Sequence, residues 1–341
     1  MDHAKIWFVL WAVLWAGYFA LDGFDLGVGF SGWLTAGNEE ERGNVFSAIG
    51  PFWDGNEVWL ITAAGATFAA FPPVYAALFS WFYPALFLIL VSLILRGVSL
   101  EFRGKQQPAA WKKFWERAAA ISSFSAALLF GTAFGNLFRG LEIDNCGYMD
   151  KFSGLLNPYA LLTGLLFCVF FFFHGQLWLS FKVSGPPAVK AQKLAGWAWY
   201  ALALLLAGFA VYSYADTGLY GNFFARRSLL ALPLLLAAAL ISARLLLARG
   251  LPEKAFLASF AAIALFILTG FAGLYPDLLA SRINPSSALT VYNSSSSPYT
   301  LKVMTAAVAV LLPLVAGCQL WAHRLFRAPL TAAELKKSGI Y

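Results

Sequence analysis

Long apolar runs, separated by short polar connectors, fill most of this chain. A helix needs roughly 20 residues to cross about 30 Å of hydrocarbon, and nine runs reach or approach that length. We therefore expect nine membrane-spanning helices, near residues 5–30, 51–71, 74–99, 116–138, 157–181, 194–214, 227–248, 254–276 and 301–325. The second run is the weakest of these, because it is short and polar where it begins.

Composition agrees with an all-α polytopic membrane protein. Of 341 residues, 60% are hydrophobic and 12% are charged, whereas soluble domains carry about 25% charged residues. No small-residue cleavage site follows the first run, so it is typical of a permanent span and not of a signal peptide. The net charge of +7 comes from Lys and Arg in short connectors. We interpret them as topology signals, and nucleic-acid binding is not expected.

The distribution of basic residues predicts the orientation. With the N-terminus outside, the inner connectors and the C-terminal tail hold 17 of the 24 Lys and Arg residues, and the outer side holds 7. An excess of Lys and Arg on the cytoplasmic side is the rule for membrane proteins. The pattern therefore predicts N-out and C-in.

A weak internal repeat indicates how the helices are grouped. Residues 116–140 and 253–277, aligned without gaps, are identical at eight of 25 positions. Repeats of this kind occur in many membrane carriers, so this one does not decide the function. We expect a four-helix bundle with acidic motifs at 1–140, a pseudo-symmetric second bundle at 141–282, and an outer loop, ninth helix and cytoplasmic tail at 283–341.

Four carboxylates lie where a bilayer disfavours them. Asp22 and Asp25 end the first apolar run, and Asp54 and Glu57 begin the second, each pair with the i, i+3 spacing of one helix face. An ionised Asp at the centre of a membrane helix costs about 2.5–3.5 kcal/mol on insertion scales, so such acids commonly serve ion or proton transfer. The short connector predicts that both pairs lie at similar depth near the inner face. A proton path is our first hypothesis.

Two neighbouring features bear on this hypothesis. Gly23 and Gly27 form a small-xxx-small pair that allows close helix approach. Arg96 ends a long apolar run, either as an anchor that reaches the membrane surface or as the counter-charge that keeps a nearby Asp ionised. The alternative for the acids is structural, in which they cap helix ends or pair with Arg96 and Arg42.

The few histidines and cysteines limit which cofactors this chain can bind. A membrane haem needs axial ligands such as a facing His pair, and only His3, His174 and His323 are present. His174 and His323 are expected near inner helix ends. We interpret each as a histidine that is hydrogen-bonded within the protein or lies at the membrane interface, and not as a haem ligand. The three cysteines form no CxxC pair, so neither a disulfide framework nor a cysteine metal site is indicated. We expect this chain to bind no haem or metal itself.

The motifs resemble those of subunit II of the cytochrome bd quinol oxidases along the whole chain. The matching segments are Asp22-Gly-Phe-Asp-Leu-Gly-Val-Gly29, Ile49-Gly-Pro-Phe-Trp-Asp-Gly-Asn-Glu-Val-Trp-Leu-Ile-Thr-Ala63, Phe68-Ala-Ala-Phe-Pro72, Leu95-Arg-Gly-Val-Ser-Leu-Glu-Phe-Arg103, Ala133-Phe-Gly-Asn-Leu137 and Leu156-Asn-Pro158. The first hundred residues are the most specific.

The resemblance implies a haem-free subunit of a heterodimer in the bacterial cytoplasmic (inner) membrane. Its partner, subunit I, would hold haems b558, b595 and d and the quinol site, and the complex would oxidise quinol and reduce O2 to water. Subunit II would supply scaffold and part of a cytoplasmic proton route to the oxygen-reducing haem. Lipid contacts are expected, and a bound structural quinone and a small single-helix accessory subunit are left open.

The resemblance also implies residue roles. Asp54 looks like the central proton-path carboxylate and Asp25 its neighbour, with Asp22 and Glu57 beside them, Glu57 at a position where some relatives have Gln. Glu101 and Lys105 match positions proposed to line the cytoplasmic entrance, which the terminal Tyr341 would join. Arg96 matches an arginine buried near the subunit contact. Two other functions stay open: a proton-coupled secondary transporter, and an anchor whose acids only form salt bridges.

Overall fold

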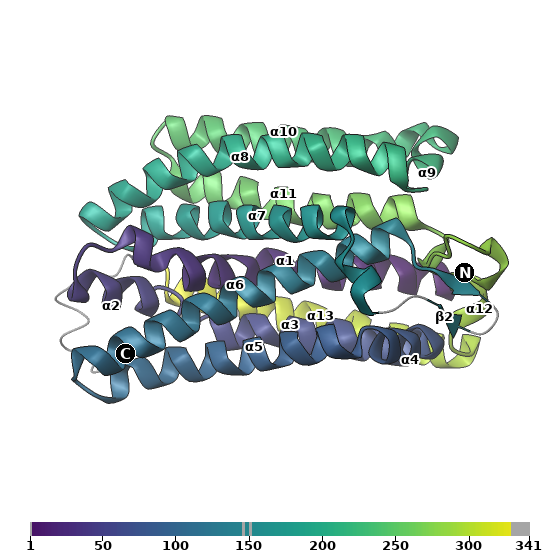
Figure 1. Ribbon diagram of the computed structural model, residues 1–341, viewed down its shortest axis with the longest axis horizontal. Helices are drawn as coiled ribbons and strands as arrows, with labels where there is room; N and C mark the ends of the chain where they lie inside the picture. Colours follow the sequence, from purple (N-terminus) through teal and green to yellow (C-terminus); the bar gives the residue numbers. More distant parts are fainter. Residues whose placement is uncertain (1, 145–146, 150–151, 329–341) are drawn as a thin grey trace.

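The computed structural model describes residues 2–144, 147–149 and 152–328, and long helices that lie side by side dominate this part of the chain (Figure 1). The long helices are α1 His3–Thr35, α3 Trp53–Ala70, α5 Tyr83–Phe102, α6 Ala109–Arg139, α7 Pro158–Lys182, α8 Pro186–Asp216, α10 Ala231–Ala248, α11 Pro252–Leu274 and α13 Pro298–Leu325. The short helices are α2 Glu39–Ser47, α4 Pro72–Trp81, η1 Arg103–Lys105, η2 Phe152–Leu156, α9 Tyr220–Ala225, η3 Arg227–Leu230, η4 Pro285–Ser287 and α12 Val291–Ser294.

Short antiparallel strand pairs lie in the two longest connectors. They are β1 Ile143–Asp144 with β2 Gly147–Tyr148, and β3 Asp277–Leu279 with β4 Leu289–Thr290. Both pairs lie at the end of the bundle that also holds α9 and the N-terminus, and α2 lies at the opposite end (Figure 1). We call these the α9 end and the α2 end.

Eight helices of the described residues are long and apolar enough to cross a membrane. They match eight of the predicted spans, and the all-helical class is confirmed. The predicted span at 51–71 forms α3, whose hydropathy is lowered by Asp54, Asn56 and Glu57 near its start. The ninth crossing therefore stays a prediction, as do the orientation and the two-bundle division.

The predicted span at 74–99 is not a single helix. The chain is divided at Phe82 into α4 and α5. Pro84 lies in the first turn of α5, where a residue without an N–H is tolerated at a helix start but cannot continue a helix. Helix α8 is also longer than expected, since it begins at Pro186 and not near 194.

Local signals fix other helix starts. The Asn157 side chain accepts a hydrogen bond from the backbone N–H of Ala160 at 2.9 Å, and Pro158 follows at the first helical position of α7. Ser297 caps α13 in the same way, ahead of Pro298. An N-cap followed by Pro satisfies one free amide and omits another, so both starts follow from the sequence.

Glycines bring α1 and α7 into close contact at the centre of the bundle. A Cβ on Gly27 would collide with the backbone of Phe171, and one on Gly175 would lie 2.7 Å from the backbone nitrogen of Val28. A Cβ on Gly23 would lie 2.8 Å from the ring of Phe171. The close approach that the small-residue pair predicts is therefore present, with α7 as the partner helix.

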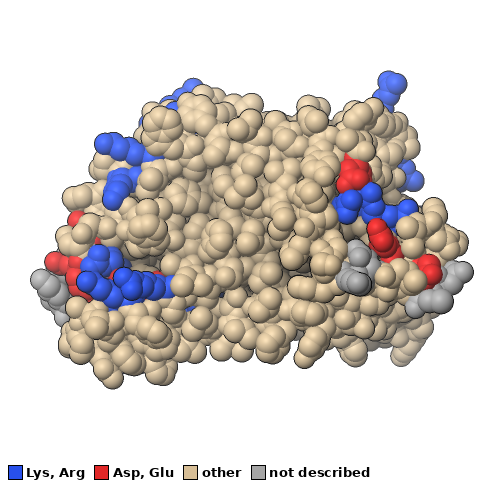
Figure 2. Space-filling model, viewed as in Figure 1, with Lys and Arg blue, Asp and Glu red and all other residues tan. Residues whose placement is uncertain are grey.

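Exposure differs strongly between the helices. Most of α7 is buried, whereas only three residues of α10 and one of α13 are buried, and apolar side chains such as Leu234 and Leu311 lie on the surface. Charged side chains gather at the two ends of the molecule, and an uncharged band separates them (Figure 2). This is the surface that a bilayer solvates.

We predict that Gly27→Ala disrupts the fold although alanine is the better helix former. The added methyl group forces α1 away from α7, which we expect to cost about 1–3 kcal/mol or more. Thermal melting of the purified chain, followed by size-exclusion chromatography, measures the loss. Gly208→Ala on the exposed face of α8 is the matched control, because nothing lies within 4 Å of its added Cβ. Equal melting temperatures for the two variants would contradict this packing.

Candidate functional site

A buried cluster of charges joins α1, α3 and α5. The Arg96 Nη2 donates to Asp22 Oδ1 at 2.8 Å and also to Glu57 Oε1. Arg96 and Asp22 are fully buried, and the Glu57 side chain is 22% exposed. One guanidinium therefore lies between two carboxylates. Because Arg96 is fully buried, it does not reach the membrane surface as an anchor, and it is the counter-charge of two acids within this chain.

Asp25 belongs to a second, amide-linked part of the same site. The Asn56 Nδ2 donates to Asp25 Oδ2 at 2.6 Å and to the carbonyl of Leu21 at 3.2 Å. Gln319, on α13, donates in turn to the Asn56 Oδ1. Asp25 and Asn56 are fully buried. These contacts extend from α1 through α3 to α13.

Several polar atoms in this site have no hydrogen-bond partner among the described residues. They are Asp22 Oδ2, Asp25 Oδ1, and Nε and Nη1 of Arg96. Buried polar atoms are nearly always satisfied, by protein groups or by ordered water. Water molecules between the two aspartates and the guanidinium would supply the missing hydrogen-bond partners. Chemically, the arrangement can hold a proton or pass one on.

The other predicted site residues lie apart from this cluster. Asp54 is exposed, because the first turn of α3 presents it on the side away from Asn56. Glu101 is partly exposed in the last turn of α5, and Lys105 is exposed in η1. Tyr341 lies outside the described residues. The structure thus joins Asp22 and Glu57 through Arg96, and it holds Asp25 through Asn56. It leaves Asp54 and Lys105 on the surface.

Sequence reasoning missed the two amides of the site. Asn56 lies between Asp54 and Glu57, whose charges are the stronger signal, and Gln319 lies in an apolar run. An amide in a membrane helix is a weak signal by itself, since it usually bonds to a neighbouring helix. A further cluster was also missed: Arg103 Nη2 lies 2.8 Å from Glu116 Oε1 and 3.1 Å from Glu39 Oε1, near the α2 end.

The two histidines of the bundle do not face each other. His174 Nδ1 lies 2.6 Å from the Ser259 hydroxyl, and its Nε2 lies 3.1 Å from the carbonyl of Ala20. His323 stacks on Phe52, with 4.6 Å between the ring centroids. Both nitrogens of His174 are thus used within the chain. No group of three His, Cys, Asp or Glu side chains suited to a metal occurs in the described ranges.

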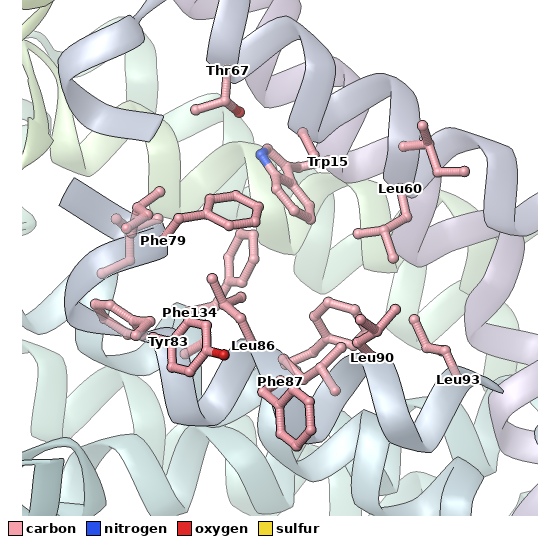
Figure 3. Close-up of a pocket in the computed structure, with 18 of the residues that line it drawn as sticks. Trp15, Leu60, Thr67, Phe79, Tyr83, Leu86, Phe87, Leu90, Leu93 and Phe134 are labelled. Atoms are coloured by element: carbon pink, nitrogen blue, oxygen red, sulfur yellow. The ribbon is translucent and has the colours of Figure 1, made fainter. Parts of the chain in front are cut away.

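An aromatic pocket lies between α1, α3, α5 and α6, with a cavity volume of about 510 Å³. Figure 3 shows Trp15, Phe79, Tyr83, Phe87 and Phe134 around it. The Thr67 hydroxyl is already bonded to Trp11 and Ala63, whereas the indole nitrogen of Trp15 is buried without a partner. The Trp15 N–H and the Tyr83 hydroxyl are thus the polar groups that this otherwise apolar wall offers.

The comparisons with known proteins agree with the motifs. The family model of cytochrome bd terminal oxidase subunit II matches residues 3–326. This chain belongs to that family. It is 36% identical over 332 residues to cytochrome bd ubiquinol oxidase subunit 2 of Bacillus subtilis, covering 96% of this chain and 97% of that protein. It is 31% identical to cytochrome bd-I ubiquinol oxidase subunit 2 of Escherichia coli K12, covering 98% and 96%.

The solved bd oxidase of Geobacillus thermodenitrificans shares the fold. A chain of that structure superposes with a TM-score of 0.77 at 17% identity, covering 95% of this chain and 99% of the other. Because of the family match, the present chain is a multi-pass subunit of a cytochrome bd terminal oxidase, an enzyme complex, as its motifs predict. In this subunit II the four charged residues of the buried cluster, Asp22, Asp25, Glu57 and Arg96, come from segments that carry the family motifs.

We predict that Arg96→Gln strongly destabilises this subunit II. The change leaves Asp22 and Glu57 buried beside a neutral amide, and removing one partner of a buried ion pair costs about 3–5 kcal/mol. Asp22→Asn in the same chain should restore part of the loss, because it removes one unpaired charge. Arg249→Gln at the exposed end of α10 is the control. Thermal melting of the four proteins tests this, and equal stability of the single and double variants would contradict it.

Proposed function

We propose that this chain is the haem-free subunit II of an oxidase that oxidises quinol and reduces O2 to water. It would pair with a haem-bearing subunit I in the bacterial cytoplasmic membrane. The names of the relatives at 36% and 31% identity support this, since both are subunits of ubiquinol oxidases and are covered almost completely. The resemblance leaves a small single-helix accessory subunit open.

Haems b558, b595 and d would belong to the partner. His174 is fully buried, and its two ring nitrogens already form hydrogen bonds with the Ser259 hydroxyl and the Ala20 carbonyl. The Nε2 of His323 has no partner, but its ring stacks on Phe52, so the two histidines of the described bundle form no facing pair of haem ligands. When present in the partner, the haems supply electron transfer and O2 reduction, and this chain supplies protons and scaffold.

The proton role rests on one observation: two fully buried aspartates in an apolar bundle, each with a carboxylate oxygen that lacks a partner. Asp22 is held by Arg96, and Asp25 is held by Asn56. A group that is fixed at one oxygen and free at the other can accept a proton from water and return it. Arg96 balances only one of its two acids, so the cluster retains affinity for a further positive charge.

The proposed route enters at the α2 end, past Lys105 and Glu101, and reaches the cluster of Asp22, Asp25 and Glu57. Asp54 lies on the exposed face of α3, where a partner subunit would cover it, and would pass protons toward that subunit. The exposed apolar surface of α5 offers the adjoining contact area. Tyr341 and a contact of Arg96 with subunit I stay predictions.

The same proposal includes nine crossings with N-out and C-in topology. Helix α3 runs between the two ends of the bundle beside α1, although its first turns are polar. Its acids would be buried by the partner or by the cluster instead of facing lipid. The excess of Lys and Arg in the connectors of the α2 end supports a cytoplasmic position for that end.

The aromatic pocket is the proposed place for a structural quinone. Its wall is apolar and aromatic, as an isoprenoid chain and a flat ring require, and the free N–H of Trp15 suits a quinone carbonyl. The residues present therefore fit such a group. The transporter alternative gains no support from the break at Phe82, which lines this apolar pocket and not a polar substrate site.

We predict that Asp25→Asn lowers quinol oxidase turnover of the purified complex at least tenfold. Positioned proton-transfer groups typically contribute about 10²–10⁴-fold. Asp54→Asn should show a loss of the same kind if the exposed acid passes protons to the partner. The reduced-minus-oxidised optical spectrum must stay unchanged, which shows that the haems are in place. Asp277→Asn, at the α9 end, is the control. Full turnover with Asp25→Asn would favour a scaffold whose acids only form salt bridges.

Orientation is tested by labelling single cysteines in intact cells. Ser228→Cys in η3 should react with a membrane-impermeant maleimide, because the α9 end is proposed to face outward. Gln107→Cys, beyond η1, should react only after the cells are permeabilised. Both positions are exposed, so accessibility within the protein does not limit the reaction. The reverse pattern would overturn the proposed N-out topology.

A further inference from the structure

A second cavity lies between α8, α10 and α11 near the α9 end, with a volume of about 420 Å³. Ligand pockets are typically about 300–1,000 Å³, so this one can hold part of a lipid or a small apolar molecule. We call it the acyl slot. Its walls are made almost entirely of Ala, Leu, Ile and Phe side chains, and the motifs that identify the family do not contribute to it.

Every polar side chain in the wall is already hydrogen-bonded within the protein. Ser213 bonds to the Tyr159 hydroxyl at 2.8 Å, and the Trp199 indole donates to the Leu240 carbonyl at 2.8 Å. Tyr220 donates to the Ala210 carbonyl, and Thr269 to that of Leu265, at 3.0 and 2.6 Å. No donor or acceptor is left for a polar ligand, and the occupant of the slot is therefore a hydrocarbon.

The slot is long and narrow enough for one acyl chain. Its lining residues on α8 run from Trp199 to Ser213, which corresponds to roughly 21 Å at 1.5 Å per residue. The hydrocarbon core of a bilayer is about 30 Å thick, so the slot runs from the α9 end through one leaflet and past the middle of the core. A single extended acyl chain has this shape.

Uncompensated positive charge lies at the outer end of the slot. Arg226 and Arg227 are exposed directly after α9, whose Phe223 lines the slot. Within the described part of the chain, neither has a carboxylate within ion-pair distance. The nearby Asp216 is already paired with Arg139 at 2.7 Å and Arg282 at 2.9 Å. Basic side chains are visible at this end of the molecule (Figure 2).

We propose that the slot binds one acyl chain of an anionic phospholipid, with the lipid phosphate at Arg226 and Arg227. The apolar wall selects the chain, and the two guanidinium groups select the charge of the headgroup. The aromatic pocket differs in this respect, because its Trp15 N–H is free for a carbonyl oxygen. This inference does not depend on the proton path or on the quinone site.

Native mass spectrometry of the purified complex tests the proposal. The complex is released from micelles that contain equal amounts of phosphatidylglycerol and phosphatidylcholine, and retained lipids are counted. The wild type should retain one more phosphatidylglycerol than Arg226→Gln/Arg227→Gln, whose affinity for it falls roughly tenfold or more. Arg249→Gln, an exposed change at the α2 end of α10, should retain the full number. High salt should weaken retention in the wild type.

A second variant tests the slot itself. Ala237→Trp fills the cavity from α10 and should remove the same lipid, whereas Leu235→Trp, on the exposed face of α10, should not. Turnover and the haem spectrum show whether each complex is assembled. If Ala237→Trp fails to assemble, the arginine variant decides, because its positions are exposed. Equal retention of the two lipids by the wild type, or unchanged phosphatidylglycerol in the arginine variant, would overturn the proposal.

Discussion

Arg96 holds its charge between Asp22 and Glu57 in the interior of an apolar bundle, and the positions of α1, α3 and α5 depend on this contact. Buried ion pairs are seldom retained for stability, because desolvation offsets most of their attraction and apolar residues of the same volume pack as well. Breaking such a pair is costly, however. The cluster therefore fixes three helices and at the same time keeps ionisable groups inside the bundle, and such groups in membrane helices commonly mark a functional site.

The amide contacts extend this constraint to a helix with little packing of its own. Leu301 is the one buried residue of helix α13, and Gln319 links this helix to Asn56 and so to Asp25. Lipid offers few alternative hydrogen-bond partners to a polar group on a membrane helix, although the measured free energy of such a bond between helices is modest. The exposed apolar faces of α13 and α5, together with Asp54 on α3, suit contact with subunit I.

The two cavities show how single polar atoms determine ligand class. Both are apolar and of similar size, and both open between helices at the surface of this chain. The free indole N–H of Trp15 suits the aromatic pocket to a ligand with a carbonyl group. In the acyl slot Ser213 and Trp199 are already hydrogen-bonded within the protein, so the slot suits hydrocarbon alone. The difference comes from hydrogen bonds to neighbouring helices, and composition does not reveal it.

Periodicity and composition were sufficient for the helical class, for eight spans, for the close approach at Gly27 and for acids gathered at one depth, because each of these follows from local sequence and bilayer thickness. Pro84 is a sequence signal for the break at Phe82, but the apolar run from 74 to 99 is long enough to be taken for one helix. Which acid pairs with Arg96, the exposure of Asp54 and the contact of Gln319 with Asn56 depend on how helices rotate and approach one another. Side chains from all faces of the bundle set that rotation together, so only the tertiary structure decided it.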